Sequence, residues 1–196
     1  MTKTNWIGSK IVHKEITGST NQDIRELALQ GAKEGTVVYA DMQTAGRGRR
    51  GRSWVSPKRD SLLFSLLLRP EISPDKASQI TLLMALAVTK VLRDRYGLEA
   101  GIKWPNDIVI TGKKVCGILT ELYPDSDGKF FVIVGCGINL NLNNEELKNI
   151  DIPATSIYKE TGKQVDKQEF LDKFLSNFEN EYNDFLINGI KGEVLC

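Results

Sequence analysis

The sequence predicts one α+β domain built on a mixed, mainly antiparallel sheet with flanking helices. Its 196 residues suffice for a domain of moderate size with a sizeable core. Segments with a strand pattern outnumber those with a helix pattern, and several strands adjoin through turns of hairpin length. These observations argue against a regular βαβ array, in which strands and helices alternate.

The first forty residues predict a strand, a helix and a second strand. Residues 10–16 have a strand pattern, and Ser19 with Gln22 fits a capping box that starts a helix. The β-branched segment 36–40 predicts the second strand, which leads into an unusual arginine- and glycine-rich segment.

A buried strand and a long helix follow. Residues 61–68 are apolar almost throughout, which predicts a strand that is buried on both faces. Ser73-Pro74 begins a helix that ends at Gly97, because proline suits the first helical turn and glycine suits the position after the last turn.

The remainder predicts four more strands and a long amphipathic helix. Hairpin turns are expected at Thr111-Gly112 and Asp127-Gly128. Residues 166–186 carry aromatic side chains three or four positions apart, which predicts a helix with one face in the core. The four strands are expected at residues 102–104, 107–110, 115–122 and 129–140.

The composition excludes several classes of protein. Because 26 Lys and Arg nearly balance 25 Asp and Glu, a protein that is basic throughout, such as a bulk nucleic-acid binder, is excluded. His13 is the single histidine and the three cysteines form no Cys-x-x-Cys pair, which excludes multi-histidine metal sites and zinc fingers. We find no signal peptide and no apolar run approaching the roughly 20 residues of a membrane span. We therefore expect a reduced, soluble, cytoplasmic protein with no membrane partner.

Positive charge is concentrated in one segment. Residues 1–144 carry 20 Lys and Arg against 14 Asp and Glu, whereas residues 145–196 carry 6 against 11. Residues 43–54, QTAGRGRRGRSW, hold four arginines, three glycines and no acid. Glycines let backbone N–H groups approach a ligand, and guanidinium forks suit phosphate or carboxylate. By itself this segment is compatible with small-anion binding, RNA binding or a solvated loop.

Two further segments carry polar groups at the ends of predicted elements. Ser19-Thr20-Asn21 would either orient a polar ligand at a helix N-terminus or simply cap the helix. In the segment KWPND, Lys103 ends a strand, and Asn106 with Asp107 would meet a metal or a ribose, or form an ordinary turn.

The segment VGCGIN, residues 134–139, contains half of a dinucleotide-binding fingerprint. Leu140 occupies the third glycine position and no helix pattern follows directly, so a Rossmann site is rejected. The sequence also lacks the phosphate-binding P-loop motif. We expect the glycines to let another group approach the strand end closely, with Asn139 placed to hydrogen-bond it.

Taken together and in this order, these segments resemble the biotin protein ligase family. GRGRRGRSW and KWPND are the most specific parts of a resemblance that runs roughly from residue 10 to residue 140. The matching segments are STN at 19–21, QTAGRGRRGRSW at 43–54, SLLFSLLLRP at 61–70, KWPND at 103–107, KKVCGILTE at 113–121 and GCGIN at 135–139.

The resemblance implies the class II aminoacyl-tRNA synthetase-like catalytic fold that is shared with lipoate ligases, and a reaction in two steps. The carboxylate of biotin would attack the α-phosphate of Mg-ATP, giving biotinyl-5′-AMP and pyrophosphate. A lysine of a biotin carboxyl carrier protein, such as that of acetyl-CoA carboxylase, would then displace AMP. ATP, Mg²⁺ and biotin are the implied ligands, and the sequence assigns no Mg²⁺ ligands. Two anions must meet in such a site, so positive charge is required there.

The family pattern also implies roles for single residues. Lys103 would bridge the carboxylate and the α-phosphate, and Arg49 would retain the intermediate, so these two are the expected catalytic residues. The residues expected around biotin are Ser19, Thr20, Asn21, Gln43, Arg47, Gly48, Arg49, Ser65, Lys103 and Gly117. Those expected around ATP and the adenylate are Arg49, Arg52, Trp54, Lys103, Asn106 and Asn139.

The resemblance also bears on domains and partners. Residues 1–188 correspond to the catalytic domain, and 189–196 to a short remnant where the family's C-terminal β-barrel domain would begin. We expect no N-terminal helix-turn-helix domain and no nucleic-acid partner. The carrier protein is the expected partner, and a homodimer is left open. The alternatives are a lipoate–protein ligase, against which the arginine-rich GRGRRGRSW argues, and a non-catalytic biotin- or RNA-binding module.

Overall fold

The computed structural model describes residues 6–56, 60–125 and 128–189. Within this part of the chain, seven strands form one sheet in the order β1-β2-β3-β7-β6-β5-β4. β1 and β2 pair in parallel, and the other neighbours pair antiparallel, which confirms the predicted mixed sheet. The strands are β1 (Ile11–Thr17), β2 (Val37–Gln43), β3 (Ser61–Leu68), β4 (Ala100–Lys103), β5 (Asp107–Ile110), β6 (Lys113–Pro124) and β7 (Phe130–Asn139).

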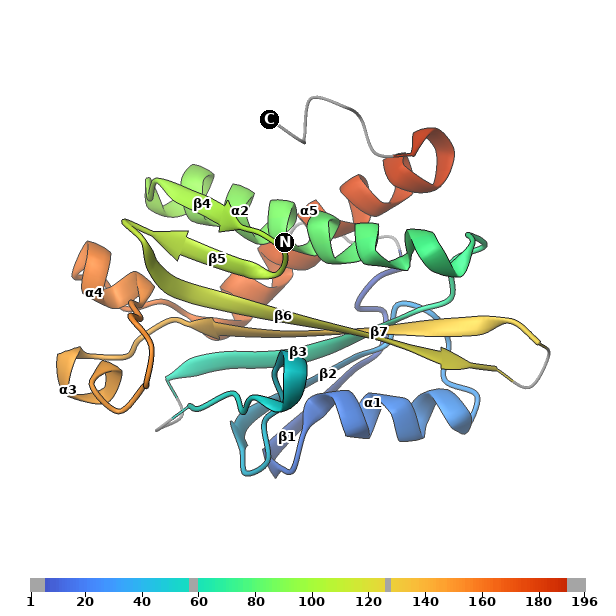
Figure 1. Ribbon diagram of the computed structural model, residues 1–196, viewed down its shortest axis with the longest axis horizontal. Coiled ribbons are helices and arrows are strands. Elements are labelled where there is room, and N and C mark those ends of the chain that lie inside the picture. The colour runs from blue at the N-terminus through green and yellow to red at the C-terminus, as the bar shows by residue number, and fades with distance from the viewer. Residues whose placement is uncertain (1–5, 57–59, 126–127, 190–196) are drawn as a thin grey trace.

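Helices cover both faces of the sheet. Figure 1 shows α1 on one face and α2 with α5 on the other. Two short helices, which the sequence pattern did not indicate, follow β7. The helices are α1 (Thr20–Leu29), α2 (Ala77–Tyr96), α3 (Asn144–Leu147), α4 (Ile157–Thr161) and α5 (Lys167–Asn188), with 3₁₀ turns η1 (Arg49–Gly51) and η2 (Pro74–Lys76).

β3 lies at the centre of the core. All eight of its residues are buried, as its apolar sequence predicts. Because alternate side chains of a strand point to opposite faces, the strand contributes to two clusters. Phe64 packs toward α5, with its ring centroid 5.0 Å from that of Phe174. Leu67 packs on the other face against Ile24 of α1.

The ends of the long helices agree with the sequence. Gly97 follows α2 in the left-handed conformation (φ 65°), in which glycine is not strained. The five aromatic residues of α5 are buried, so its stripe is part of the core. No helix of the described residues is long and apolar enough to cross a membrane.

The hairpin turns are confirmed in part. Thr111 and Gly112 both have positive φ and join β5 to β6, as predicted. The other predicted turn, Asp127-Gly128, joins β6 to β7, and its Asp127 lies outside the described residues.

The face of the sheet that carries α1 also carries an open region next to the start of that helix. Ile133 of β7 packs against α1. Since alternate residues share a face, Gly135 and Gly137 lie on the same side, further along the strand. The absence of side chains at these two positions leaves room above the sheet for other groups.

Candidate binding pocket

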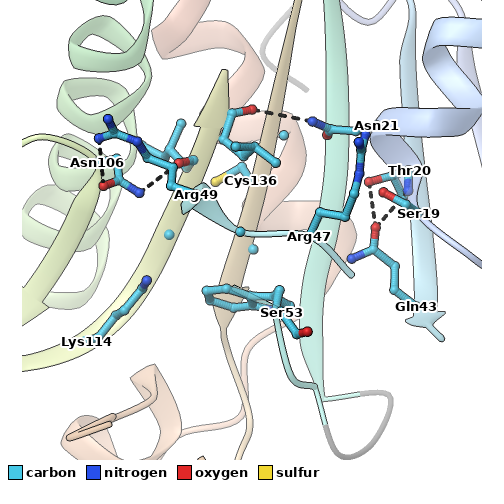
Figure 2. A pocket seen from close by; sticks show the side chains of 17 residues that line it. Ser19, Thr20, Asn21, Gln43, Arg47, Arg49, Ser53, Asn106, Lys114 and Cys136 are labelled. Atoms are coloured by element: carbon cyan, nitrogen blue, oxygen red, sulfur yellow. Dashed lines mark hydrogen bonds between the residues drawn. The ribbon is translucent and has the colours of Figure 1, made fainter. Parts of the chain in front are cut away.

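A pocket lies above β6 and β7, between the start of α1 and the segment that follows β2. Figure 2 shows Thr20 and Gln43 on one side of it, and Arg49, Asn106 and Lys114 on the other. Its lining residues are Ser19, Thr20, Asn21, Gln43, Arg47, Gly48, Arg49, Ser53, Trp54, Asn106, Lys114, Gly117, Ile118, Leu119, Gly135, Cys136 and Gly137.

The start of α1 forms the polar end of the pocket. The backbone N–H of Thr20 and its hydroxyl both donate to Gln43 Oε1, at 2.7 and 3.0 Å. Ser19 has the extended backbone of a helix cap, but its side chain makes no capping hydrogen bond. The predicted capping box of Ser19 with Gln22 is therefore wrong. Its hydroxyl, buried in the pocket lining, is not used by the helix.

Asn21 lies flat against β7 because residue 135 has no side chain. A Cβ on Gly135 would lie 2.0 Å from Asn21 Oδ1, closer than atoms can approach. The buried Ser65 Oγ lies 2.5 Å from the same oxygen and 2.8 Å from Thr20 Oγ1. Ser65 thus supports the two pocket residues from behind and is not itself part of the lining.

The arginine-rich segment folds into a tight loop over the pocket. Gly48 N–H donates to the Arg52 carbonyl at 2.7 Å, and Arg50 and Gly51 at its tip have φ of 56° and 75°. The side chains of Arg47 and Arg49 fix it to the sheet side of the pocket. Arg47 Nη2 lies 2.9 Å from Glu121 Oε2, and Arg49 Nη1 donates to Asn106 Oδ1 at 3.3 Å.

Trp54, at the end of this loop, packs over two glycines of the sheet. A Cβ on Gly137 would lie 2.4 Å from the indole, and one on Gly117 would lie 2.8 Å from it. Close approach at the Gly-x-Gly strand end, which the sequence predicts, is therefore confirmed for Gly137, and Gly135 admits Asn21 in the same way. The indole Nε1 is buried and has no hydrogen-bond partner.

Lys114 supplies a cation that the sequence analysis did not single out. Its Nζ lies 2.7 Å from Asp107 Oδ1 and 5.5 Å from the centroid of the Trp54 ring. The side chain of Lys103, by contrast, is exposed and lies outside the pocket lining. Lys103 nevertheless lies on the pocket face of the sheet, because it is paired with Asp107, which is paired with Gly117 of the pocket floor. Its expected role therefore stays a prediction. A lysine three residues before the glycine of KKVCGILTE is the signal that would have identified Lys114.

Two other expected residues also lie outside this pocket. Arg52 is exposed, and its carbonyl closes the loop. Asn139 is buried and donates to the Thr155 carbonyl at 3.1 Å, while its Oδ1 has no partner. It lines a neighbouring cavity of 150 Å³ that Trp54 and Lys114 also line. Ser53, Trp54 and Lys114 therefore form the boundary that the two cavities share.

The pocket lining carries three cations, Arg47, Arg49 and Lys114, and no carboxylate. Glu121 and Asp107, next to the lining, already pair with Arg47 and Lys114. Arg49, which is hydrogen-bonded to a neutral amide, is therefore the cation most available to an anionic ligand. Burial and the neighbouring Cys116 thiol raise the pKa of Cys136 well above its ordinary value, so this cysteine contributes an uncharged thiol to the pocket lining. The cavity measures 70 Å³, below the roughly 300–1,000 Å³ of typical ligand sites, so the loop and Trp54 must shift to admit a ligand.

Comparison with known proteins places these features in context. Residues 14–139 match the model of the Biotin/lipoate A/B protein ligase family. The chain is 41% identical over 191 residues to the Bifunctional ligase/repressor BirA of Bacillus subtilis and 40% identical over 165 residues to the Biotin--[acetyl-CoA-carboxylase] ligase of Paracoccus denitrificans. The alignments cover 95% and 80% of this chain, and 58% and 66% of those relatives.

A solved structure shows the same architecture. The biotin protein ligase from Aquifex aeolicus in complex with biotin and ATP superposes with a TM-score of 0.78 at 33% identity, covering 92% of this chain and 73% of that one. The fold is therefore that of the biotin protein ligases, as the sequence motifs predict. The expected domain boundary at residue 188 stays a prediction, since residues 190–196 lie outside the described residues.

Proposed function

Because the chain belongs to the biotin/lipoate A/B protein ligase family, we propose that it activates biotin with ATP and transfers the biotinyl group to a lysine of a biotin carboxyl carrier protein. One observation carries the proposal. A single pocket combines a hydrogen-bonding end at the start of α1 with three cations and no carboxylate. A cyclic urea joined to a carboxylate needs both of these features.

The polar end suits the ureido ring of biotin. That ring offers two N–H donors and one carbonyl acceptor, and hydroxyl and amide side chains pair with both kinds of group. Ser19, Thr20 and Asn21 provide such groups from one helix start, and Gln43 fixes Thr20 through two hydrogen bonds. We assign the ring to this end of the pocket.

The cationic end suits the reacting groups. A biotin carboxylate oxygen attacks the α-phosphorus of ATP, and the bond to the pyrophosphate oxygen breaks. Lys114 and Arg49 would offset the charge of the carboxylate and of the crowded phosphate oxygens, which is worth several kcal/mol in a site that excludes water. Lys114 lines the pocket, and Lys103 lies exposed on the same face of the sheet, so the bridging role of Lys103 stays a prediction from the family pattern with Lys114 as a second candidate.

The neighbouring cavity suits the adenosine part of ATP. Trp54 offers an aromatic face there, and Asn139 Oδ1 and Trp54 Nε1 are buried polar atoms without partners. A purine carries both donors and acceptors that would pair with such atoms. A phosphate contact of Arg52 stays a prediction from the family pattern.

Magnesium would enter with ATP. Among residues 6–56, 60–125 and 128–189, no cluster of three His, Cys, Asp or Glu could hold a metal ion. Mg²⁺ in nucleotide-dependent enzymes usually binds phosphates, several waters and one or two carboxylates. Asp107, partly buried beside Lys114, fits that pattern as a single carboxylate.

In the second step, the acceptor lysine supplies the nucleophile. Its neutral amine attacks the acyl carbon, the bond to the AMP oxygen breaks, and the amine loses a proton to solvent. No side chain of the pocket needs to form a covalent bond, in keeping with the protonated state of Cys136. Location in the cytoplasm stays a prediction from the sequence.

Biotin-dependent exchange of pyrophosphate into ATP tests the first step, and mass spectrometry of a carrier domain incubated with the protein, biotin and Mg-ATP tests the second. We expect exchange only when biotin is present, and a mass increase on one carrier lysine. Absence of exchange at saturating biotin and Mg-ATP would contradict the enzymatic proposal.

A further inference from the structure

Glu121 is a charged residue of the KKVCGILTE segment to which neither the family pattern nor the proposed reaction gives a role. Its carboxylate receives hydrogen bonds from three elements. Oε2 accepts from Arg47 Nη2 of the loop at 2.9 Å and from Asn21 Nδ2 of α1 at 2.7 Å. Oε1 accepts from the hydroxyl of Tyr123, two residues further along β6, at 3.1 Å.

The position of Glu121 follows from the alternation of β6. Leu119 lies opposite Gly135, and Glu121 lies opposite Ile133, which packs against α1. Leu119 and Glu121 therefore share the face of the sheet that forms the pocket floor. Glu121 is next to the lining without belonging to it, so it acts through Arg47 and Asn21 and not on a ligand.

The ion pair distinguishes Arg47 from Arg49, the other arginine of the loop that lines the pocket. Arg47 is held by a full negative charge, whereas Arg49 is hydrogen-bonded to the neutral amide of Asn106. Two full charges attract each other more strongly than a charge and an amide dipole do, and the Arg47 contact is also the shorter one, so Arg47 is the firmer anchor of the loop. Arg49 keeps its charge available to an anion in the pocket.

We propose that Glu121 is a positioning residue that fastens the arginine-rich loop over the acyl-adenylate between the two reaction steps. The inference rests on the proposed function. In the absence of the Glu121 charge, Arg47 loses its anchor, the loop opens more often, and the intermediate escapes before the carrier lysine arrives. Formation of the adenylate, which depends on Lys114 and Arg49, changes far less.

Glu121→Gln is the sharpest test, because glutamine keeps the shape and one acceptor oxygen but removes the charge. We expect the release rate of radiolabelled biotinyl-5′-AMP from the preformed complex to rise about tenfold, the factor that corresponds to roughly 1.4 kcal/mol. Biotin-dependent pyrophosphate exchange at saturating substrates should change less than about threefold. Arg47→Gln removes the same ion pair and also a cation of the pocket lining, so it should raise the release rate at least as much.

Two controls separate the ion pair from general damage. Tyr123→Phe removes the hydrogen bond to Oε1 and keeps the charge pair, so its release rate should match that of the unmodified protein. The double variant with both glutamines should release the adenylate no faster than Arg47→Gln alone, because residues that act through one interaction are not additive.

The outcomes are distinguishable. An unchanged release rate in Glu121→Gln, or additive effects in the double variant, would overturn the role of Glu121 while leaving the proposed function intact. An unmodified protein that forms no adenylate would instead overturn the proposed function itself.

Discussion

At the scale of single residues, the shape of the pocket depends on side chains that are missing. Gly135 admits Asn21, and Gly137 with Gly117 admits Trp54, each at distances that a Cβ would forbid. The sequence indicated close approach at Gly-x-Gly but not the approaching residues. Asn21 is more than one hundred positions away from Gly135, and a strand pattern carries no information about which distant group covers it.

Gly135→Ala should therefore disturb both stability and ligand binding. The new Cβ displaces Asn21 Oδ1 from its contact with Ser65, and overpacking of this kind costs about 1–3 kcal/mol. Denaturant unfolding and calorimetric titration with biotin measure the two effects. Gly101→Ala, in a strand position with nothing within 4 Å, is the control and should shift stability by no more than about 0.5 kcal/mol. Equal effects of the two substitutions would contradict this account.

The two lysines can be separated by substitution. Lys114→Ala should lower the rate of biotin-dependent pyrophosphate exchange by about 10²–10³-fold, the loss that follows removal of a positioned donor to developing charge. Lys103→Ala, on the same face of the sheet, should lower the rate comparably if Lys103 bridges the carboxylate and the α-phosphate, as the family pattern implies. A near-normal rate in Lys103→Ala would leave the bridging role to Lys114.

Glu121 and Lys114 show why the sequence left part of the site unassigned. Glu121 binds partners 74 and 100 positions away in the sequence, so no local pattern marks it. Lys114 follows another lysine at the start of a strand, where two adjacent charges are typical of a solvated turn. The pocket lining includes Ser19, Thr20, Gln43 and Arg49, which could be named from the sequence because each lies in a motif of the family.

At the scale of elements, the strands and long helices were predictable because periodicity and turn residues agree. The start of α1 is an exception: Ser19 begins the helix, yet its capping hydrogen bond is absent and its hydroxyl faces the pocket. The short helices α3 and α4 were not predicted, since four or five residues are too few to show a period. The capping rule for helix starts thus fails at Ser19, a residue of the pocket lining.

α5 fastens the core on the side of the sheet opposite the pocket. Phe178 is fully buried and stacks between Phe174 and Tyr182, with centroids 5.8 and 5.7 Å away. Phe178→Ala should lower the free energy of unfolding by about 3–5 kcal/mol. Ile187→Ala, at an 81% exposed position of the same helix, should change it by less than about 0.5 kcal/mol. Urea unfolding followed by circular dichroism measures both, and comparable losses would mean that the helix contributes through its length and not through this aromatic stripe.

At the scale of the whole molecule, the net charge conceals an uneven distribution of cations between the arginine-rich loop and the rest of the chain. The chain carries a net charge of +1, but three of its cations line one pocket that has no carboxylate. Average composition therefore argued against a bulk nucleic-acid binder without revealing this cationic lining. That site became visible only when the segments were read together.

Ligand-induced stabilisation distinguishes biotin from the alternatives. A ligand at one hundred times its dissociation constant adds about 2.7 kcal/mol, which for a chain of this size raises the melting temperature by roughly 5–10 °C. We expect this shift with biotin, little shift with lipoic acid, and little change between 50 and 200 mM salt. A larger shift with lipoic acid would favour the lipoate ligase, and RNA affinity that falls about 10³-fold over that salt range would favour an RNA-binding module.

The indole of Trp54 packs on the backbone of two glycines beside both cavities, and this position makes its fluorescence sensitive to ligands. The emission of tryptophan depends on the polarity around the ring. Because Trp54 lines both cavities, the groups in contact with its ring should change when a ligand enters either of them. Trp104 is 84% exposed and Trp6 packs near Tyr182, and neither lines these two cavities. Replacing those two by phenylalanine would leave one fluorophore at the centre of the site. The protein would then report a ligand that enters either cavity by its own fluorescence, without an added label.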